Sequence, residues 1–269
     1  MQRALETVIP CLAACLVLPS SASAATLFAD QFGGGGGDLN GEVPEVSSGA
    51  SWVASTIFNA DGSTEQGAGS ATLAFTPADG LIYNLDVRIS GISPTTGTTN
   101  NWIAAGFVNG QSTLSGTNHR FITGEVVGTA WMMHRGDISL GTNQSFLGTG
   151  QLGAGNFGLG VGGGDNTGER WALDPASPDI DLRVVLDTTA GPGGWTATWF
   201  AKAVSDSTFT EVRSATPLLA GATISAVGVA RANGDFTATV ESFTLTTVPE
   251  PSVALLAVLG GLAGLRRRR

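Results

Sequence analysis

Few residue patterns in this sequence could do acid–base chemistry. The nearest to a glycosidase pair is Asp179-Ile180-Asp181, because alternate residues of a strand project to one face and a retaining glycosidase needs two carboxyl groups about 5 Å apart. The pair comes directly after Pro178, where exposed acids before a strand are common, and it lacks a third carboxylate. We therefore assign it no catalytic role.

Histidine chemistry is equally sparse. The only two histidines are His119 and His134, and the chain has no Gly-x-Ser-x-Gly motif that would present a nucleophilic serine. Alternation along a strand directs His134 and Met132 to one face, and Trp131 and Arg135 to the other. The pattern predicts neither a catalytic triad nor a zinc site, and we expect the protein not to be an enzyme.

Flat aromatic rings near arginine are typical of sugar-binding surfaces. Trp131 with Arg135, and Trp171 directly after the acidic loop at residues 165–170, are the least obviously structural of the six tryptophans. Together with Arg120 they are the candidate ligand-binding residues, and carbohydrate is the expected ligand. The alternative for Trp131 is packing in the core.

The other tryptophans are expected in the core. Trp195 and Trp199 are four residues apart on one predicted strand, so they share a face. Trp52 and Trp102 each begin an apolar strand.

One acidic loop leaves room for a calcium ion, which takes six to eight oxygen ligands. The best candidates are Asp165, Glu169 and Asp174, although their spacing does not match an EF-hand and a solvated turn is the alternative. No other cofactor is expected.

The elements that would position these residues are strands. Short runs rich in Val, Ile, Thr and aromatic residues alternate with glycine-rich breaks, and no long stretch has apolar residues at helical spacing. The predicted strands cover residues 26–32, 51–58, 71–75, 81–89, 102–108, 130–135, 157–161, 182–187, 195–203, 224–230 and 236–246. Turns such as Asn40-Gly41 and Asn233-Gly234 separate them, as in an all-β sandwich of two antiparallel sheets.

Four segments carry a resemblance to a known fold. Residues 181–188, a glycine-rich turn and residues 195–200 resemble the paired strands of concanavalin A-like and laminin G-like jelly rolls, as do residues 224–229 leading into 236–245. The resemblance implies a jelly-roll sandwich in which the last strand pairs near the first. It implies no activity, since lectins, glycosidases and lyases share the fold.

The N-terminus has the three parts of a signal peptide. Arg3 provides a basic residue, residues 8–18 are mostly apolar, and Ala22-Ser23-Ala24 is a small-residue cleavage site. We predict cleavage after Ala24, so that residues 1–24 are removed. The alternative is a lipoprotein box ending at Cys15.

The remaining domain, residues 25–247, has no cysteine, because Cys11 and Cys15 lie in the leader. Disulfides and thiol chemistry are therefore excluded there, and the core alone must stabilise the fold. Of the 13 basic and 22 acidic residues, eight and 20 lie in this domain, giving a net charge of −12. This charge argues against nucleic acid or anionic lipid as a partner.

The C-terminus, residues 248–269, has three further parts in order. They are Pro249-Glu250-Pro251, an uncharged apolar run to Leu265, and four arginines, Arg266, Arg267, Arg268 and Arg269. Residues 252–265 as a helix would span only about 21 Å of a hydrocarbon core of about 30 Å. Insertion is therefore marginal, and the arginines hold the C-terminus on the cytoplasmic side.

This segment resembles the PEP-CTERM sorting domain of Gram-negative envelopes. The resemblance implies handling by an exosortase, a membrane protease-transpeptidase that removes the helix near the Pro-Glu-Pro motif. It predicts an exported protein, tethered transiently to the inner membrane and then placed at the cell surface or in an exopolysaccharide matrix. One alternative is a plain tail anchor with a chance Pro-Glu-Pro. Another, for the domain, is a secreted polysaccharide hydrolase or lyase with an unfamiliar site.

Overall fold

The structure is a computed structural model that describes residues 24–92, 102–110, 121, 127–135, 145–149, 160–161, 165–166, 169–171, 177, 179–234 and 236–249. All regular structure in these ranges is β-strand. Within them, no helical segment has the length and hydropathy needed to cross a bilayer. The predicted all-β class is confirmed, whereas the signal peptide and the C-terminal helix lie outside the described residues, except for Ala24.

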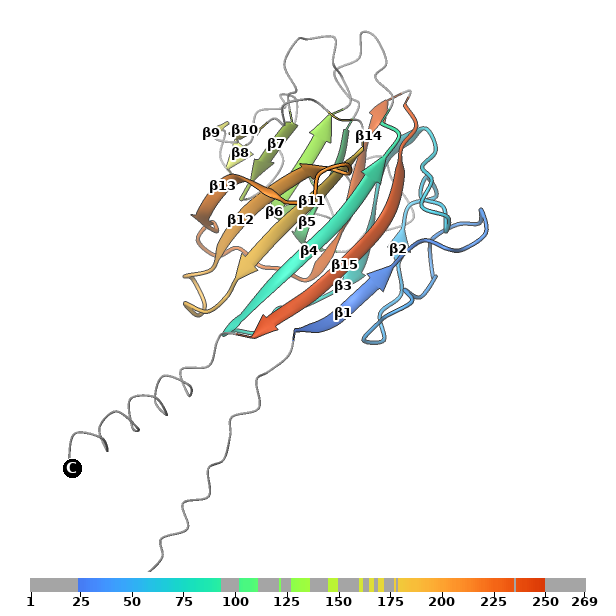
Figure 1. Ribbon diagram of the computed structural model, residues 1–269. Helices are drawn as coiled ribbons and strands as arrows, with labels where there is room; N and C mark the ends of the chain where they lie inside the picture. Colours follow the sequence, from blue (N-terminus) through green and yellow to red (C-terminus); the bar gives the residue numbers. More distant parts are fainter. Residues whose placement is uncertain are drawn as a thin grey trace, which may run out of the picture. The chain divides into compact units, whose positions relative to one another are not determined.

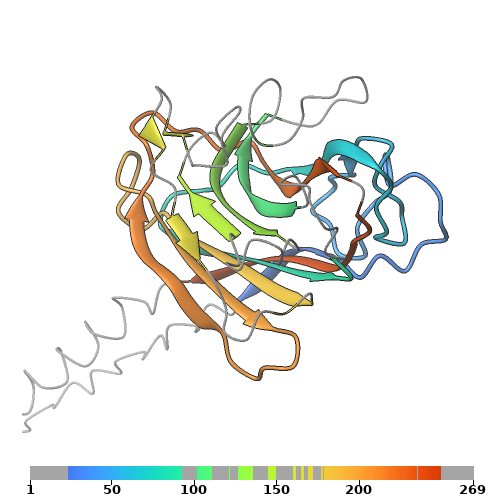
Figure 2. The same cartoon turned by 90° about the horizontal axis from the view of Figure 1, so that it is seen from above.

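Two antiparallel sheets form the domain (Figure 1). The six-stranded sheet has the order β1-β15-β4-β11-β12-β13. Its strands are β1 (Ala25–Asp30), β4 (Leu81–Ser90), β11 (Ile180–Asp187), β12 (Thr196–Ala203), β13 (Thr210–Pro217) and β15 (Thr239–Pro249). The view from above shows this sheet lying against a second layer (Figure 2).

The second layer is a seven-stranded sheet with the order β10-β7-β6-β5-β14-β3-β2. Its strands are β2 (Val53–Ala54), β3 (Gly67–Ala74), β5 (Trp102–Asn109), β6 (Val127–Arg135), β7 (Ser145–Gly148), β10 (Glu169–Trp171) and β14 (Ala226–Gly234). A small separate pair joins β8 (Gly160–Val161) to β9 (Asp165–Asn166). The predicted sandwich of two antiparallel sheets is therefore confirmed.

The chain crosses between the layers several times. It passes from β3 to β4, from β4 to β5, from β13 to β14 and from β14 to β15, each time changing sheets. The first and last strands are neighbours, with Ala25 opposite Thr247 and Asp30 opposite Phe243. The expected pairing of the final strand with the first is confirmed.

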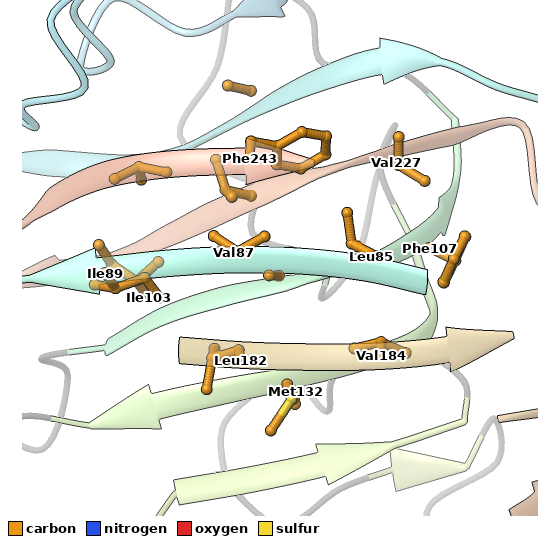
Figure 3. Packing of buried hydrophobic residues seen from close by; sticks show 14 of the residues in the cluster. Leu85, Val87, Ile89, Ile103, Phe107, Met132, Leu182, Val184, Val227 and Phe243 are labelled. Carbon is orange, nitrogen blue, oxygen red and sulfur yellow. The ribbon is translucent and has the colours of Figure 1, made fainter. Parts of the chain in front are cut away.

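The core lies between the two sheets (Figure 3). In β4, Leu85, Val87 and Ile89 are buried, while the residues between them, including Asp86 and Arg88, are only partly buried. This alternation is the pattern of a strand with solvent on one face. The two layers are also joined by a hydrogen bond, because the Trp199 indole Nε1 of β12 donates to the Trp131 carbonyl oxygen of β6 at 3.0 Å.

The outer face of the seven-stranded sheet is apolar as well. A second buried cluster covers it, here called the outer apolar cluster, and its members are Trp102, Ala104, Val108, Phe121, Trp131, Met133, Ala226 and Ala230. All are at most 1% exposed. The strand β5 is therefore buried along nearly its whole length, on both faces.

Two parts of the strand pattern differ from the prediction. Of residues 51–58 only Val53–Ala54 form a strand, and turns and isolated bridges follow. Strands β7, β9, β10 and β13 were not predicted. The strand β13 is polar and mostly exposed along its length, since it is the edge of its sheet, so it lacks an apolar run that periodicity could detect.

Candidate ligand-binding site

A half-open pocket of about 430 Å³ lies between two connections at one end of the six-stranded sheet. One wall is the turn between β11 and β12, and the other is the loop between β13 and β14. The volume is within the range of small-ligand sites. The lining residues are Pro192, Gly193, Trp195, Leu218, Leu219, Gly221, Ala222 and Thr223.

Trp195 is the aromatic residue of this pocket. It lies one residue before β12, on the same face as Trp199, but at the strand end it is only partly buried. Its indole Nε1 donates to the Asp79 carboxylate at 3.0 Å, and its carbonyl oxygen accepts the Leu218 amide at 2.9 Å. The first bond sets the ring's orientation, and the second attaches the opposite wall.

The turn that carries Asp79 is held by buried groups. The Thr188 hydroxyl accepts the Leu81 amide at 3.0 Å and lies 2.8 Å from the Ala78 carbonyl oxygen. The Tyr83 hydroxyl accepts the Ala78 amide at 2.7 Å, and burial raises the pKa of this phenol. Fixed on both sides, the turn presents the Asp79 carboxylate to the indole.

Glycines keep the pocket open. Gly193 and Gly221 have φ angles of 83° and 77°, a backbone conformation that residues other than glycine rarely adopt. No heavy atom lies within 4 Å of the point where a Cβ would stand at either position. The turns are therefore tight, and the space beside them is free.

The lining of the pocket is uncharged. The eight residues contribute an indole, aliphatic surface, the exposed Thr223 hydroxyl and main-chain groups, and none of them is charged. They include no general base or nucleophile with a partner. The pocket can hold a neutral solute that has both apolar and hydroxyl surface.

The predicted ligand-binding residues lie elsewhere. Trp131 is 1% exposed in the outer apolar cluster, and Trp171 is 5% exposed in the main core. Both rings therefore pack in the interior, as the core alternative for Trp131 required. The Arg135 backbone pairs with Trp102 at the end of β6, and Arg120 lies outside the described residues.

His134 lies inside the sandwich. Its Nδ1 is 3.0 Å from the Ser145 hydroxyl and its Nε2 is 3.1 Å from the Ser177 carbonyl oxygen, while the ring packs 5.9 Å from Trp171. Burial lowers the pKa of His134 to about 4, so it is neutral at pH 7. The predicted separation from Trp131 across the sheet is confirmed. His119 lies outside the described residues.

The carboxylates weighed for catalysis have structural partners. Arg88 binds Asp181 through two hydrogen bonds of 2.7 and 2.9 Å, and Lys202 approaches it at 3.0 Å. Burial alone would raise the pKa of Asp181, but the hydrogen bonds from Arg88 and Lys202 outweigh it and the net pKa is lowered. Asp179 accepts the Gly91 amide at 2.9 Å.

The calcium prediction concerns β9 and β10. Asp165 begins β9 and Glu169 begins β10, and Asp174 lies outside the described residues. No group of three or more histidine or acidic side chains that could hold a metal occurs in the part of the chain that the structure describes. Calcium at this loop stays a prediction.

The first and last strands of the described domain are neighbours, with Ala25 opposite Thr247. Ala24 precedes β1, and Pro249 is the last residue of β15, in register with Leu81 of β4. The rest of the sorting motif, Glu250, Pro251 and Arg266 to Arg269, lies outside the described residues, as does Ala22.

Comparison with known proteins gives structural likeness only. No family model matches the sequence, and no curated protein matches it. Three solved structures illustrate the likeness. The exoplasmic/lumenal domain of VIP36, in a form bound to Ca²⁺ and Man3GlcNAc, has a TM-score of 0.45 at 13% identity, covering 74% of this chain and 83% of that one.

The second is a lectin from Bauhinia forficata in complex with GalNAc, with a TM-score of 0.47 at 10% identity. The match covers 84% of this chain and 99% of the lectin. The third is an engineered GH43 glycoside hydrolase, with a TM-score of 0.42 at 14% identity, covering 85% of this chain and 42% of the enzyme. The chain is similar to lectin-type β-sandwiches, and its own strand order establishes the fold.

Proposed function

We propose that this chain is an exported, non-enzymatic β-sandwich protein, sorted to the cell surface or an exopolysaccharide matrix by an exosortase-type protease-transpeptidase. The observation that carries the proposal is the position of the domain's two ends. Ala25 lies opposite Thr247 on neighbouring antiparallel strands, so the chain enters and leaves the domain about one strand spacing apart, roughly 5 Å.

This arrangement suits a chain that is held at a membrane by both ends. A leader with Arg3 and a tail with Arg266 to Arg269 both leave positive charge on the cytoplasmic side. The domain between them is then on the far side, and both of its connections must face the membrane. Adjacent ends satisfy that requirement without unfolding a strand.

Deletion and motif variants test the sorting. Removing residues 250–269, which leaves β15 complete, should release the protein into the periplasm or medium of a Gram-negative host that has an exosortase. Changing Glu250 and Pro251 to Ala, with Pro249 kept to preserve the end of β15, should leave an uncut protein in the inner membrane. If the double variant is cut and located like the wild type, the Pro-Glu-Pro motif does not direct the sorting; if the wild type itself stays uncut in the inner membrane, the tail is a plain anchor.

The ligand part of the proposal is carbohydrate binding. The pocket at Trp195 favours it, because an indole beside hydroxyl and main-chain groups suits a sugar ring. The alternative of a hydrolase or lyase has less support, since Asp181 and Asp86 are each paired with arginine. Release of reducing ends or unsaturated products from matrix polysaccharide by the purified protein would favour the enzyme.

A further inference from the structure

We propose that the pocket at Trp195 is a binding site for neutral sugar residues, selective against acidic ones. The inference rests on the proposed carbohydrate-binding function and adds the site and the sugar class. It replaces Trp131 and Trp171, whose rings are buried.

The indole is the only tryptophan ring positioned for a ligand. Trp195 is partly exposed, whereas the other five tryptophans are at most 5% exposed, namely Trp52, Trp102, Trp131, Trp171 and Trp199. The face of an aromatic ring carries partial negative charge. The C–H groups of a sugar are polarised positively by their oxygens, so they pack on such a face.

The ring is held in place before any ligand arrives. Asp79 fixes the indole Nε1 at 3.0 Å, and Thr188 and Tyr83 fix the turn that carries Asp79. Thr188 also accepts the Gly191 amide through its carbonyl oxygen at 3.1 Å, which anchors the turn on the wall of the pocket. A preorganised aromatic group loses little conformational entropy on binding.

Charge selects the class of sugar. The lining residues carry no cation, and the indole Nε1 of Trp195 is hydrogen-bonded to the Asp79 carboxylate. The domain as a whole has eight basic and 20 acidic residues. An acidic sugar would have no counter-charge here and would be repelled, while the Thr223 hydroxyl and the glycine main chain can bond to neutral hydroxyl groups.

The burial pattern provides a site-specific assay. Because five of the six tryptophans are buried, quenching of fluorescence by acrylamide should report mainly on Trp195. A sugar bound in the pocket should protect this ring. The full chain is purified in a zwitterionic detergent without a sugar head group, since a glycoside detergent would compete.

The experiment uses an array of neutral and acidic oligosaccharides, followed by titration with the best neutral binder and with an alginate oligomer. The wild type should bind neutral oligosaccharides, with protection from acrylamide. W195A should lose about tenfold or more in affinity, and W195F, which keeps a ring but loses the bond to Asp79, should lose less. Phe209→Ala, a partly exposed aromatic outside the pocket, is the matched control and should bind as the wild type.

Asp79→Asn separates positioning from charge. The asparagine oxygen can still accept the indole N–H, so neutral binding should stay within about twofold, while binding of the alginate oligomer should rise. Wild-type glycan binding that W195A leaves intact would overturn the site but keep the carbohydrate function. If an apolar solute protects Trp195 from acrylamide and the wild type binds no glycan on the array, both the sugar site and the carbohydrate-binding function are overturned.

Discussion

The outer faces of the two sheets differ in chemistry, although their inner faces form one core. On the six-stranded sheet, the outer face carries Asp86 paired with Arg183 at 2.6 Å, and Asp181 paired with Arg88 and Lys202. On the seven-stranded sheet, the outer face carries the outer apolar cluster, with every member buried. The outer face of the six-stranded sheet is therefore charged and faces solvent, whereas that of the seven-stranded sheet forms a second buried core.

The difference shows where a ligand can bind. The outer apolar cluster is buried and so offers no surface to a ligand, while Asp86 and Asp181 on the polar face are already paired with basic side chains. The pocket at Trp195 lies on neither face, but at a sheet end, between the β11–β12 turn of the six-stranded sheet and the β13–β14 loop that leads to the other sheet. Recognition at sandwich edges by loops is a common arrangement, since the sheets supply a rigid support.

The largest expected difference between the faces comes from aromatic truncation. Trp131→Ala empties a fully buried site of the outer apolar cluster and should lower the free energy of unfolding by about 3 to 5 kcal/mol. Phe209→Ala on the charged face, where the ring lies 4.2 Å from the Arg183 guanidinium, should cost about 1 kcal/mol or less. Urea denaturation measures both. Equal costs would contradict the comparison.

As the pH is lowered, the seven-stranded sheet should be destabilised before the six-stranded sheet. The pKa of His134 is about 4 in the folded protein because of burial, against 6.5 for an unperturbed histidine. Between these values the unfolded state binds more protons, so stability should fall as the pH drops from 6.5 to 4, by up to roughly 3 kcal/mol.

Denaturant midpoints at several pH values test this, with His134→Gln as the control that should remove the slope in that window. The lowered pKa of Asp181 on the other sheet makes its contribution disappear only at lower pH. A wild-type midpoint that stays flat from pH 6.5 to 4 would show that His134 is accessible to protonation in the fold.

Close backbone contact within the seven-stranded sheet gives the next effect. A Cβ on Gly228 of β14 would stand 2.2 Å from the Ala71 carbonyl oxygen and 2.9 Å from the Thr72 Cα of β3. Gly228→Ala should therefore destabilise by about 1 to 3 kcal/mol through overpacking. Gly35→Ala, with no heavy atom within 4 Å, should be near neutral in the same thermal melts. Matching melting temperatures for the two variants would refute the steric account.

The smallest effect is expected from the ion pair on the charged face. The Arg88 side chain is 43% exposed, so solvent screens its attraction to Asp181, and Lys202 remains beside the carboxylate. Arg88→Met should cost about 1 kcal/mol or less, with a smaller cost in 1 M salt. A loss of several kcal/mol that does not depend on salt would contradict this, because it would show that solvent does not screen the Arg88–Asp181 pair.

The sequence was informative where a strand carries a run of apolar and β-branched residues. Such runs predicted β4, β5 and β11 closely. The edge strand β13 was missed because its exposed polar residues carry no periodic signal. The strand predicted over residues 51–58 was too long. An apolar run does not reveal that the backbone turns after the two paired residues, Val53 and Ala54.

The site was harder to predict for a physical reason. A tryptophan in a strand pattern reads the same whether the opposite layer covers it, as at Trp199, or ends beside it, as at Trp195. The pocket joins residues from the turn before β12 and the loop after β13, with Asp79 contributed from more than a hundred residues earlier. Only the fold brings these together, although the Gly-Pro-Gly-Gly sequence at 191–194 indicated a turn.

The export of this domain and the removal of both its terminal segments is the central claim, and the mass of the protein recovered from the cell surface tests it most directly. We expect a species that begins at Ala25 and lacks Arg266 to Arg269, located in the surface or matrix fraction. A full-length chain with both ends intact, found in the cytosol, would contradict it.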